Sequence, residues 1–443
     1  MELGSWSLIQ APSLLALIPL ALMIVLAFKG FHNAFACFAG IVLAALMMGQ
    51  DPGNVANALK TSMGTTTALI GMIIMMGAGL GNLMTESGVT KTLVYWIVKR
   101  IGVNTQAKAK ICLIICSVTI CGLLGTLGGG NAVIAPILLP IMASLGVCPS
   151  AVACLFKIAG EIGLMVGPLT GVTLITMEVT GLSYGQLMLQ AVLPFSIFWL
   201  AGAWLGANHV QKKLQGKEYY EVTTDIKNLD SVVISAEDSR NTVIFLAAFF
   251  LLVLYGILSK QGTAYALIVM IILEAVVAIC TRMKVDHAMN AIIKGVASQA
   301  GMFLVFITIE ALLSYVTLGG GFEALSNLLG GFAGDSPTAV MLIASLVGGF
   351  GIEAAAVAEI KIISGMFGEL ALTTGLPMGC FAVSILAATR LTGSAYPTSN
   401  FAGQIGIAHC DNTKEALKAC WMSVIFAAAF VVFYAFVGPM ILS

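Results

Sequence analysis

Charge is scarce in this sequence, and so are the side-chain clusters that most enzymes need. Only 9% of the 443 residues are Asp, Glu, Lys or Arg, and 21 basic residues balance 21 acidic ones. No basic patch of the kind that binds nucleic acid is present, and no Cys/His group has the spacing of metal ligands. No nucleophile or phosphate-binding motif stands out. We therefore expect neither an enzyme nor a metal, cofactor or nucleic-acid partner.

Apolar residues dominate instead. Hydrophobic residues make up 59% of the chain, and its mean hydropathy is +1.00. No soluble domain buries that much apolar surface, so lipid must solvate most of it. The apolar runs are continuous and about 20 residues long, which is typical of membrane-spanning helices. We expect an all-α polytopic membrane protein, multi-pass in a bacterial cytoplasmic (inner) membrane.

The apolar runs predict about 11–12 spans, with re-entrant hairpins among them, because several runs are too short or too glycine-rich to cross fully. In the first half the expected helical runs are 12–28, 33–49, 66–85, 110–127, 131–147, 149–166 and 187–207. In the second half they are 241–258, 263–281, 298–318, 338–352, 354–372, 376–392 and 416–440. The run 11–28 is expected to be the first span and not a cleavable signal, since no basic leader precedes it.

The second half of the chain repeats the first. Segment 156–173 aligned on segment 385–402 pairs Pro168 with Pro397, and segment 55–64 matches 289–298 at nearly the same offset. A helix break at the same place in each half is typical of the binding region of a secondary transporter. The expected organisation is a first transmembrane repeat at 1–208, a hydrophilic cytoplasmic linker at 209–240 and a second transmembrane repeat at 241–443.

Loop charge predicts that the two repeats are inverted. Loop 86–110 carries five basic residues and one acid, which predicts a cytoplasmic position, whereas its counterpart 320–337 has two acids and no basic residue. Loops 50–60 and 282–294 show the opposite bias, since the second is the basic one. Equivalent loops therefore face opposite sides of the membrane, as in inverted-topology repeats with broken helices.

Ionisable residues inside the expected spans are functional candidates, because each costs at least about 2.5–3.5 kcal/mol to insert. Proton or ion coupling is assigned to Glu161, Glu353 and Glu359. Two of these acids have a lysine close in sequence, at Lys157 and Lys361. The pairs Lys157–Glu161 and Glu359–Lys361 are alternatively internal ion pairs that only fix packing.

Arg390 has no acidic residue within four positions. Its guanidinium stays charged and forms planar, bidentate hydrogen bonds to carboxylates. We expect it either to pair with Glu161 across the pseudo-axis or to clamp an anionic ligand.

Two breaks and a glycine-rich turn supply the expected substrate site. Proline removes a backbone donor and disfavours helix at the residue before it, which frees carbonyls for a cation and presents a helix N-terminus to an anion. Segment 125–131 (GTLGGGN) is expected to be a re-entrant tip, with 346–353 (LVGGFGIE) as its counterpart. The expected substrate-binding residues are Gly129, Gly130, Asn131, Pro168, Thr170, Thr173, Arg390, Thr392, Ser394, Pro397, Thr398, Ser399 and Asn400.

Segment 63–89 resembles the early region of the gluconate permease family. The shared elements are the Ala-Leu-Ile run at 68–70, the Gly77-Ala78-x-Leu80-Gly81 step and the Ser87-Gly88 close. Length, twin breaks and a central linker resemble the wider ion transporter superfamily, with anaerobic C4-dicarboxylate carriers, citrate carriers and sodium/proton antiporters. Gluconate permeases tend to have a histidine- and proline-rich first break, which here is Gly-Pro-Leu-Thr-Gly at 167–171. The resemblance implies inverted repeats, a homodimer and cation-coupled symport of an organic anion.

The expected function is secondary active transport, in which Na+ or H+ drives symport of a small organic anion (carboxylate or amino acid) by alternating access. Arg390 would receive the carboxylate, unwound carbonyls would hold sodium, and Glu161 or Glu359 would carry the proton if protons are coupled. The alternative is a Na+/H+ antiporter without an organic substrate, in which Arg390 is structural. Membrane lipid and a second copy of the chain are the other expected partners.

Overall fold

The computed structural model describes residues 2–220, 234–333, 336–349 and 356–442. Within these residues the chain is helical and contains no strand. Nine of the described helices are long and apolar enough to cross a membrane. Five shorter apolar helices, including Leu14–Phe28 and Ala264–Cys280, are also present among the described residues, and the number of 11–12 spans expected from the sequence stays a prediction. The fold class predicted from composition is therefore confirmed.

The first half consists of a 3₁₀ turn η1 and eleven α-helices, interrupted by a π-helical turn η2. Their bounds are η1 (Leu14–Leu17), α1 (Ile18–Phe28), α2 (Asn33–Met47), α3 (Pro52–Ser62), α4 (Thr66–Glu86), α5 (Val89–Ile101), α6 (Gln106–Leu124), α7 (Leu127–Ser144), α8 (Pro149–Val166), α9 (Gly171–Thr180), α10 (Tyr184–Leu187), η2 (Met188–Val192) and α11 (Leu193–Leu214).

The second half consists of ten helices. They are α12 (Ala236–Leu258), α13 (Ala264–Cys280), α14 (Val285–Ser298), α15 (Ala300–Leu318), α16 (Gly321–Ala333), α17 (Pro337–Leu346), α18 (Ala356–Thr373), α19 (Met378–Ala395), α20 (Ser399–Ile407) and α21 (Thr413–Leu442). Residues 221–233 of the expected linker lie outside the described residues, so the division into domains stays a prediction.

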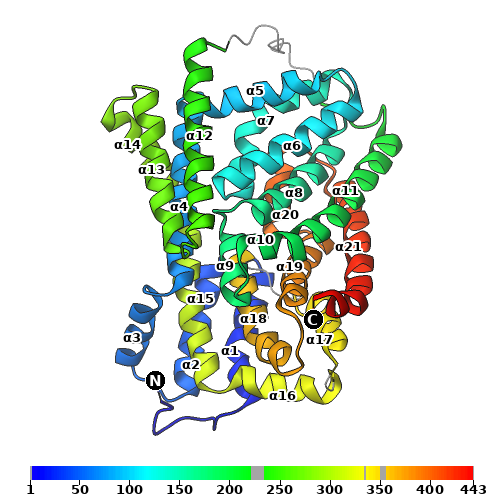
Figure 1. Ribbon diagram of the computed structural model, residues 1–443. Helices are drawn as coiled ribbons and strands as arrows, with labels where there is room; N and C mark the ends of the chain where they lie inside the picture. The colour runs from blue at the N-terminus through cyan, green and yellow to red at the C-terminus, as the bar shows by residue number, and fades with distance from the viewer. Residues whose placement is uncertain (1, 221–233, 334–335, 350–355, 443) are drawn as a thin grey trace.

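The order of elements is the same in both halves, but the direction is reversed. Helix α5 lies across the upper end of the molecule and α16 across the lower end (Figure 1). Each of these helices is followed by a hairpin, α6–α7 or α17–α18, then by a broken helix, α8–α9 or α19–α20, and finally by a long helix, α11 or α21. This arrangement is the inverted repeat that the loop charges predicted.

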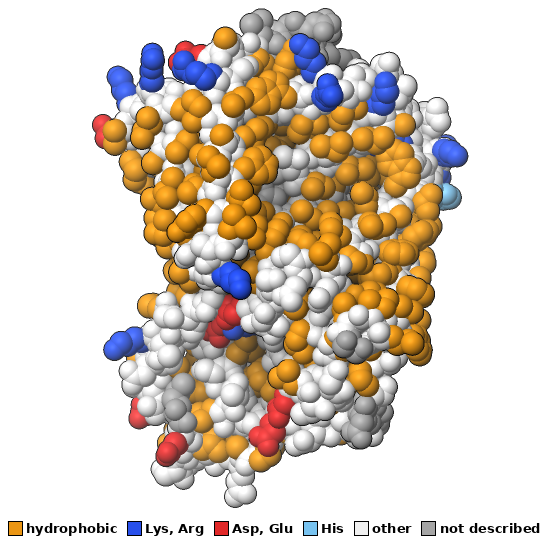
Figure 2. All heavy atoms as spheres, viewed as in Figure 1, with side chains coloured by type: hydrophobic (Ala, Val, Ile, Leu, Met, Phe, Trp, Pro, Cys, Tyr) orange, Lys and Arg blue, Asp and Glu red, His pale blue; other side chains and the backbone are white. Residues whose placement is uncertain are grey.

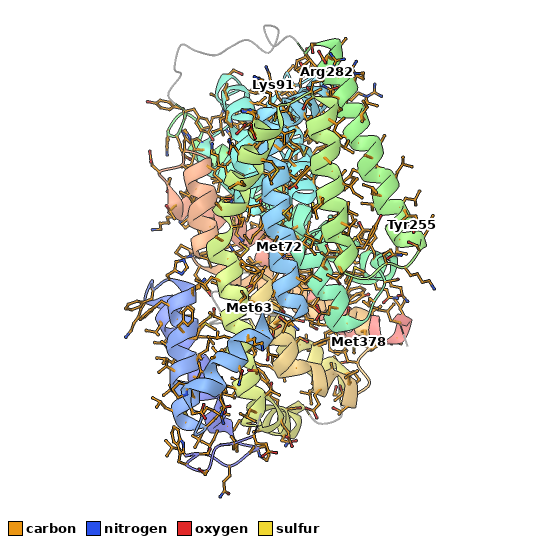
Figure 3. All side chains as sticks on the ribbon, turned by 90° about the vertical axis from the view of Figure 1, so that its left-hand side faces the viewer. Met63, Met72, Lys91, Tyr255, Arg282 and Met378 are labelled. Carbon is orange, nitrogen blue, oxygen red and sulfur yellow. The ribbon has the colours of Figure 1, made fainter. Side chains whose placement is uncertain are left out.

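Loops that were expected to share a side do lie at one end. Figure 3 shows Lys91 and Arg282 at the same end of the molecule. Nearby, the His287 imidazole Nε2 lies 3.1 Å from a carboxylate oxygen of Glu86. In Figure 2, Lys and Arg side chains gather along this upper end, while apolar side chains cover the middle of the visible face. The expected cytoplasmic end is thus the basic one.

The two breaks have the same local cause. Helix α8 ends at Val166, and Gly167 adopts an extended backbone with ψ 124° just before Pro168. Helix α19 ends at Ala395, and Tyr396 is extended with φ −138° and ψ 165° just before Pro397. In both cases the proline ring disfavours the helical region for the residue before it. The structure therefore breaks both helices where the sequence placed the breaks.

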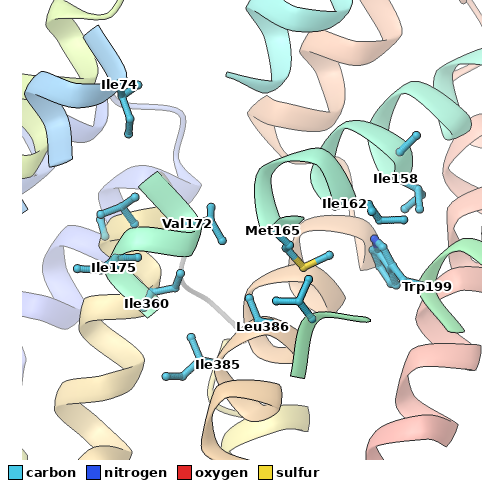
Figure 4. Close-up of a cluster of buried hydrophobic side chains, with 14 of the residues drawn as sticks. Ile74, Ile158, Ile162, Met165, Val172, Ile175, Trp199, Ile360, Ile385 and Leu386 are labelled. Carbon is cyan, nitrogen blue, oxygen red and sulfur yellow. The ribbon is translucent and has the colours of Figure 1, made fainter. Parts of the chain in front are cut away.

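Close packing holds the breaks in place. In Figure 4, Ile158, Ile162 and Met165 of α8 lie near Trp199 of α11 and Leu386 of α19. In the same view, Val172 and Ile175 of α9 lie near Ile360 of α18. All of these side chains are buried or nearly so. The last turn of α8 and the first turn of α9 therefore pack against different neighbours, which fixes the direction of each.

Candidate functional site

A cavity of about 590 Å³ lies where the breaks and the first hairpin tip meet. One side of it comes from the first turn of α7, from α8 and α9, and from α18, α19 and α20. The other side comes from the α1–α2 turn, from α4 and from the start of α15. A small organic molecule fits a cavity of this size.

Several helices begin at the cavity. Among the described lining residues, Asn33 of α2, Gly128 and Gly129 of α7, Val172 of α9, Gly301 of α15 and Asn400 of α20 each lie in the first turn of a helix. Helix α7 receives no side-chain cap from Thr126. The backbone N–H groups at a helix N-terminus, together with the helix dipole, favour an anion. The convergence of several such ends makes this cavity suited to a negatively charged ligand.

Arg390 is a buried cation in the wall of this cavity. Its side chain is only 2% exposed, and its Nη1 donates to the Thr389 hydroxyl at 3.1 Å. Its Nε and Nη2 have no hydrogen-bond partner among the described residues. Buried donors without an acceptor are costly, and for a charged group the cost is larger. An anion in the cavity would supply the missing acceptors.

The acid expected to pair with Arg390 is engaged elsewhere. Glu161 forms an ion pair with Lys157, one turn earlier on α8, and also accepts from the Trp199 indole Nε1 at 3.3 Å. Lys157 and Glu161 are 1% and 7% exposed at their side chains and both line the cavity. No ion pair joins Arg390 to Glu161 within the part of the chain that the structure describes. Of the two sequence-based readings of Arg390, the geometry favours the clamp.

The alternative pair Glu359–Lys361 does not form. Lys361 Nζ instead lies 3.5 Å from Glu178 of α9 and 3.4 Å from Glu310 of α15, and Glu310 also accepts from the Thr67 hydroxyl of α4. Residues two apart on a helix point to different faces, so they do not meet. Glu359 remains in the cavity wall, as expected for a coupling candidate. Glu353 lies outside the described residues.

At the first break, the predicted hydroxyls bond to backbone carbonyls. The Thr170 hydroxyl caps α9 by accepting from Thr173 N–H at 3.3 Å and donates toward the carbonyls of Leu164 and Gly167. The Thr173 hydroxyl donates to the Met165 carbonyl at 2.8 Å. Neither threonine nor Pro168 lines the cavity. The break thus gathers five oxygen atoms directly behind the cavity wall.

At the second break, only part of the predicted set reaches the cavity. Thr398, which caps α20 through Phe401 N–H at 3.2 Å, lines the cavity together with Asn400. The Thr392 hydroxyl bonds to the Ala388 carbonyl at 2.8 Å within its own helix, and the Ser394 hydroxyl is buried with no partner among the described residues. Pro397 and Thr392 do not line the cavity. The side chain of Ser399 lies outside the described residues.

Of the residues predicted at the glycine-rich tip, again only part reaches the cavity. Gly129 lines the cavity, whereas Gly130 packs against Cys121, whose Sγ is 2.6 Å from where a Cβ would stand. Asn131 is buried. Its amide donates to the Phe156 carbonyl at 2.9 Å and to Gln404 Oε1 at 2.7 Å, so it ties the hairpin to α8 and α20.

Sequence reasoning missed the opposite wall. It is formed by Phe31, His32 and Asn33 in the α1–α2 turn, Ile74 of α4, and residues 299–306 at the start of α15. These residues carry no motif. A related signal in the sequence was the match between segments 55–64 and 289–298. Each of these segments ends close to the gap before the next helix, which lies at residues 63–65 in the first half and at residue 299 in the second half.

The comparisons with known proteins agree with this fold. A model of the family described as "Tripartite ATP-independent periplasmic transporter, DctM component" matches residues 17–440. A solved structure of MtrF from Neisseria gonorrhoeae, presented with a class of antimetabolite efflux pumps, is similar with a TM-score of 0.57. At 12% identity, over 98% of this chain and 96% of that one, it shows the fold alone. No curated protein matches the chain.

Proposed function

The chain belongs to the family of DctM components of tripartite ATP-independent periplasmic transporters, and from this premise we propose that it carries out cation-coupled symport of a small organic anion by alternating access. As a DctM component, it is a membrane protein of a secondary carboxylate transporter in the bacterial inner membrane and not an enzyme. Such transporters typically contain a periplasmic binding protein, DctP, and a second membrane component, DctQ.

Arg390 carries the proposal. Two nitrogens of its buried guanidinium lack acceptors among the described residues, and the first turns of α7, α9 and α20 line the same cavity. A carboxylate placed there would accept from the guanidinium in bidentate geometry and would also interact favourably with the helix ends. A Na+/H+ antiporter without an organic substrate would leave these donors unused. The unpaired guanidinium therefore supports the symporter over the alternative function.

For the coupling cation we propose sodium at the first break. Carbonyl and hydroxyl oxygens are ligands for hard cations, and unwound carbonyls coordinate sodium in broken-helix transporters. The hydroxyls of Thr170 and Thr173 donate to the carbonyls of Leu164, Met165 and Gly167, so these five oxygen atoms gather at the break. If protons are coupled instead, the cavity-lining carboxylates Glu161 and Glu359 are the carriers.

Alternating access fits the division of the cavity. One wall comes from the helices that contain the breaks and hairpins, and the other comes from α1, α2, α4 and α15. Movement of the first group against the second would open the cavity to each side of the membrane in turn. The homodimer and the division into two repeats joined by a linker remain part of this proposal.

The test of the site is to replace Arg390. In Arg390→Lys, a point charge replaces a planar fork, so affinity for carboxylates should fall at least tenfold, which is about 1.4 kcal/mol. Arg390→Gln should lose binding altogether. Thermal unfolding of the purified protein, titrated with carboxylates in the presence of sodium, measures this directly, because a ligand of the folded state raises the melting temperature.

The matched control is Arg100→Gln, which removes an exposed arginine on α5 far from the cavity. It should bind as the unchanged protein does. The unliganded melting temperature of Arg390→Gln should not fall, since the change removes buried donors that have no partner. Unchanged affinity in Arg390→Lys would leave Arg390 a structural residue and would end the clamp proposal.

A further inference from the structure

We propose that the transported anion carries one carboxylate on a predominantly apolar body, so that the cavity selects monocarboxylates over dicarboxylates. This inference rests on the proposed function, because it takes Arg390 as the carboxylate site. It specifies the substrate class, which membership of the family leaves open.

The first argument is the number of cations that can meet a ligand. Among the described residues that line the cavity, Lys157 and Arg390 are the only lysine and arginine. Lys157 already forms an ion pair with Glu161 and is 1% exposed at its side chain. One guanidinium therefore remains for the ligand, and it matches one carboxylate.

The second argument is the sign of the other charges. Glu161 and Glu359 line the same cavity. A second carboxylate would lie near one or both without an uncommitted cation beside it, and like charges at short range repel strongly in a partly desolvated site. The cavity thus disfavours a dianion as well as lacking a partner for it.

The third argument is the apolar part of the lining. Ile74 of α4, Val305 and Phe306 of α15, Val172 of α9 and Val357 of α18 contribute apolar side chains to the cavity. Apolar groups that leave water for such a wall are stabilised, whereas a charged group loses its hydration without compensation. The substrate body that fits this wall is an alkyl or aryl group.

Neutral polar groups at the α1–α2 turn suit a single oxygen substituent. His32, Asn33 and Gln299 line this part of the cavity. The His32 Nδ1 accepts from Ala34 N–H at 3.2 Å, so in the neutral ring Nε2 carries the proton and is a donor. A 2-hydroxy or 2-oxo group can bond to such side chains without bringing charge. The geometry therefore points to hydroxy or oxo monocarboxylates.

The test uses pairs of ligands that differ only in the second carboxylate. Malate and 2-hydroxybutyrate form one pair, and succinate and butyrate form the other. Thermal unfolding of the full chain in detergent with sodium should give at least tenfold tighter binding for the monocarboxylate of each pair. Tighter binding of malate and succinate, lost in Arg390→Lys, would overturn this inference while leaving the proposed function intact. Failure of all four anions to bind the unchanged protein would contradict both.

A charge added to the apolar wall provides the second test. Val305→Lys adds a second cation to the cavity lining and should shift the preference toward malate by tenfold or more. Val305→Met, a side chain of similar length without charge, is the control and should keep the preference for 2-hydroxybutyrate. If Val305→Lys folds and still prefers 2-hydroxybutyrate to the same degree, a missing cation does not set the selectivity, and the inference fails.

Discussion

The Thr170 hydroxyl at the first break bonds to backbone groups on both sides of the interruption. It accepts from Thr173 N–H, which caps α9, and donates toward carbonyls at the end of α8. A capping hydroxyl is worth about 1 kcal/mol. The same oxygen is a candidate ligand for the coupling cation. The Thr170 side chain is therefore expected to contribute both to stability and to ion coupling. A sodium titration separates the two roles.

Replacing Thr170 with valine should weaken sodium coupling. Valine keeps the shape of threonine but removes the hydroxyl, so we expect the sodium concentration for half-maximal uptake to rise at least tenfold. Uptake by the full transporter in proteoliposomes, measured over a range of sodium concentrations, gives this value. Thr180→Val is the control. The Thr180 hydroxyl donates to the Thr176 carbonyl within α9 and accepts from the Leu182 N–H in the following turn. An unchanged sodium dependence in Thr170→Val would move the coupling role to Glu161 or Glu359.

Residue identity and spacing predicted some contacts and misled on others. The pair Lys157–Glu161 forms because residues four apart share a helix face. The pair Glu359–Lys361 does not, and Lys361 reaches acids on α9 and α15, far away in sequence. Asn131 looked like a ligand residue because it ends a glycine run, yet it links three helices. A buried polar side chain takes its role from its neighbours, which spacing within one segment does not reveal.

At the scale of elements, small residues bring α11 and α21 into close contact. A Cβ at Gly206 would stand 2.0 Å from the Ala419 carbonyl oxygen, and one at Gly202 would stand 2.4 Å from the Ser423 Cα. The obstacles are backbone atoms, which cannot rotate away. Helices in lipid gain little from the hydrophobic effect and depend on close van der Waals packing. The two long helices that end the halves therefore depend on these glycines for their contact.

Gly206→Ala should destabilise the protein by about 1–3 kcal/mol, because the added methyl group forces α11 away from α21. A lower melting temperature in detergent would show this. Gly185→Ala is the matched control on α10, where nothing lies within 4 Å of the added methyl. There, better helix propensity should leave stability equal or raise it by up to about 1 kcal/mol. If the two variants melt at the same temperature, the α11–α21 contact is less tight than the structure shows.

Boundaries of the helices followed from local signals. The expected run 149–166 corresponds to α8 (Pro149–Val166), and the expected runs 33–49 and 298–318 end within two residues of α2 and α15. Hydrophobic length, proline and glycine are properties of a segment, so a segment is enough to predict them. The hairpin arms α6 and α7 also began near their expected positions, although their pairing depends on α8 packing against them.

At the scale of the whole molecule, the inverted repeat makes a topological prediction. Cysteines introduced at Arg100 and Asn290 should react with a membrane-impermeant maleimide from the cytoplasm, and one at Gly330 should react from outside. Helix α5 and the start of α14, which contains Asn290, lie at the basic end of the molecule, while α16 lies at the other end. Labelling in intact and permeabilised cells measures the side. Labelling of positions 100 and 330 from the same side would refute the inverted arrangement.

The native cysteines are expected to contribute little maleimide labelling to this experiment. Nine of the ten are buried, and Cys280 is half-buried. Burial raises the pKa of Cys148 and of Cys410, at the ends of membrane helices, to about 11. Only the thiolate reacts with maleimides at an appreciable rate, so the two thiols should stay unlabelled at neutral pH in the folded protein.

The sequence by itself determined the class of the protein, the apolar helices, the two breaks and the inverted order of the halves, whereas α3, α5, α14 and α16 lie in segments that were expected to be loops. These features depend on composition, on proline stereochemistry and on loop charge, all of which act within a segment or along the chain. It also singled out Arg390, because a lone guanidinium inside an apolar run needs an anion somewhere.

Only the tertiary structure decided which charged side chains are paired and which of them line the same cavity. It placed Glu161 with Lys157 and Trp199, left Arg390 open to the cavity, and brought α4 and α15 to the opposite wall. The contact between α4 and α15 joins segments more than two hundred residues apart, and the lining of the cavity depends on the rotation of each helix about its axis. If a helix were rotated by a third of a turn about its axis, a residue that lines the cavity would be exchanged for a buried one. The composition of the segment is the same in both cases, so composition does not predict which residue lines the cavity.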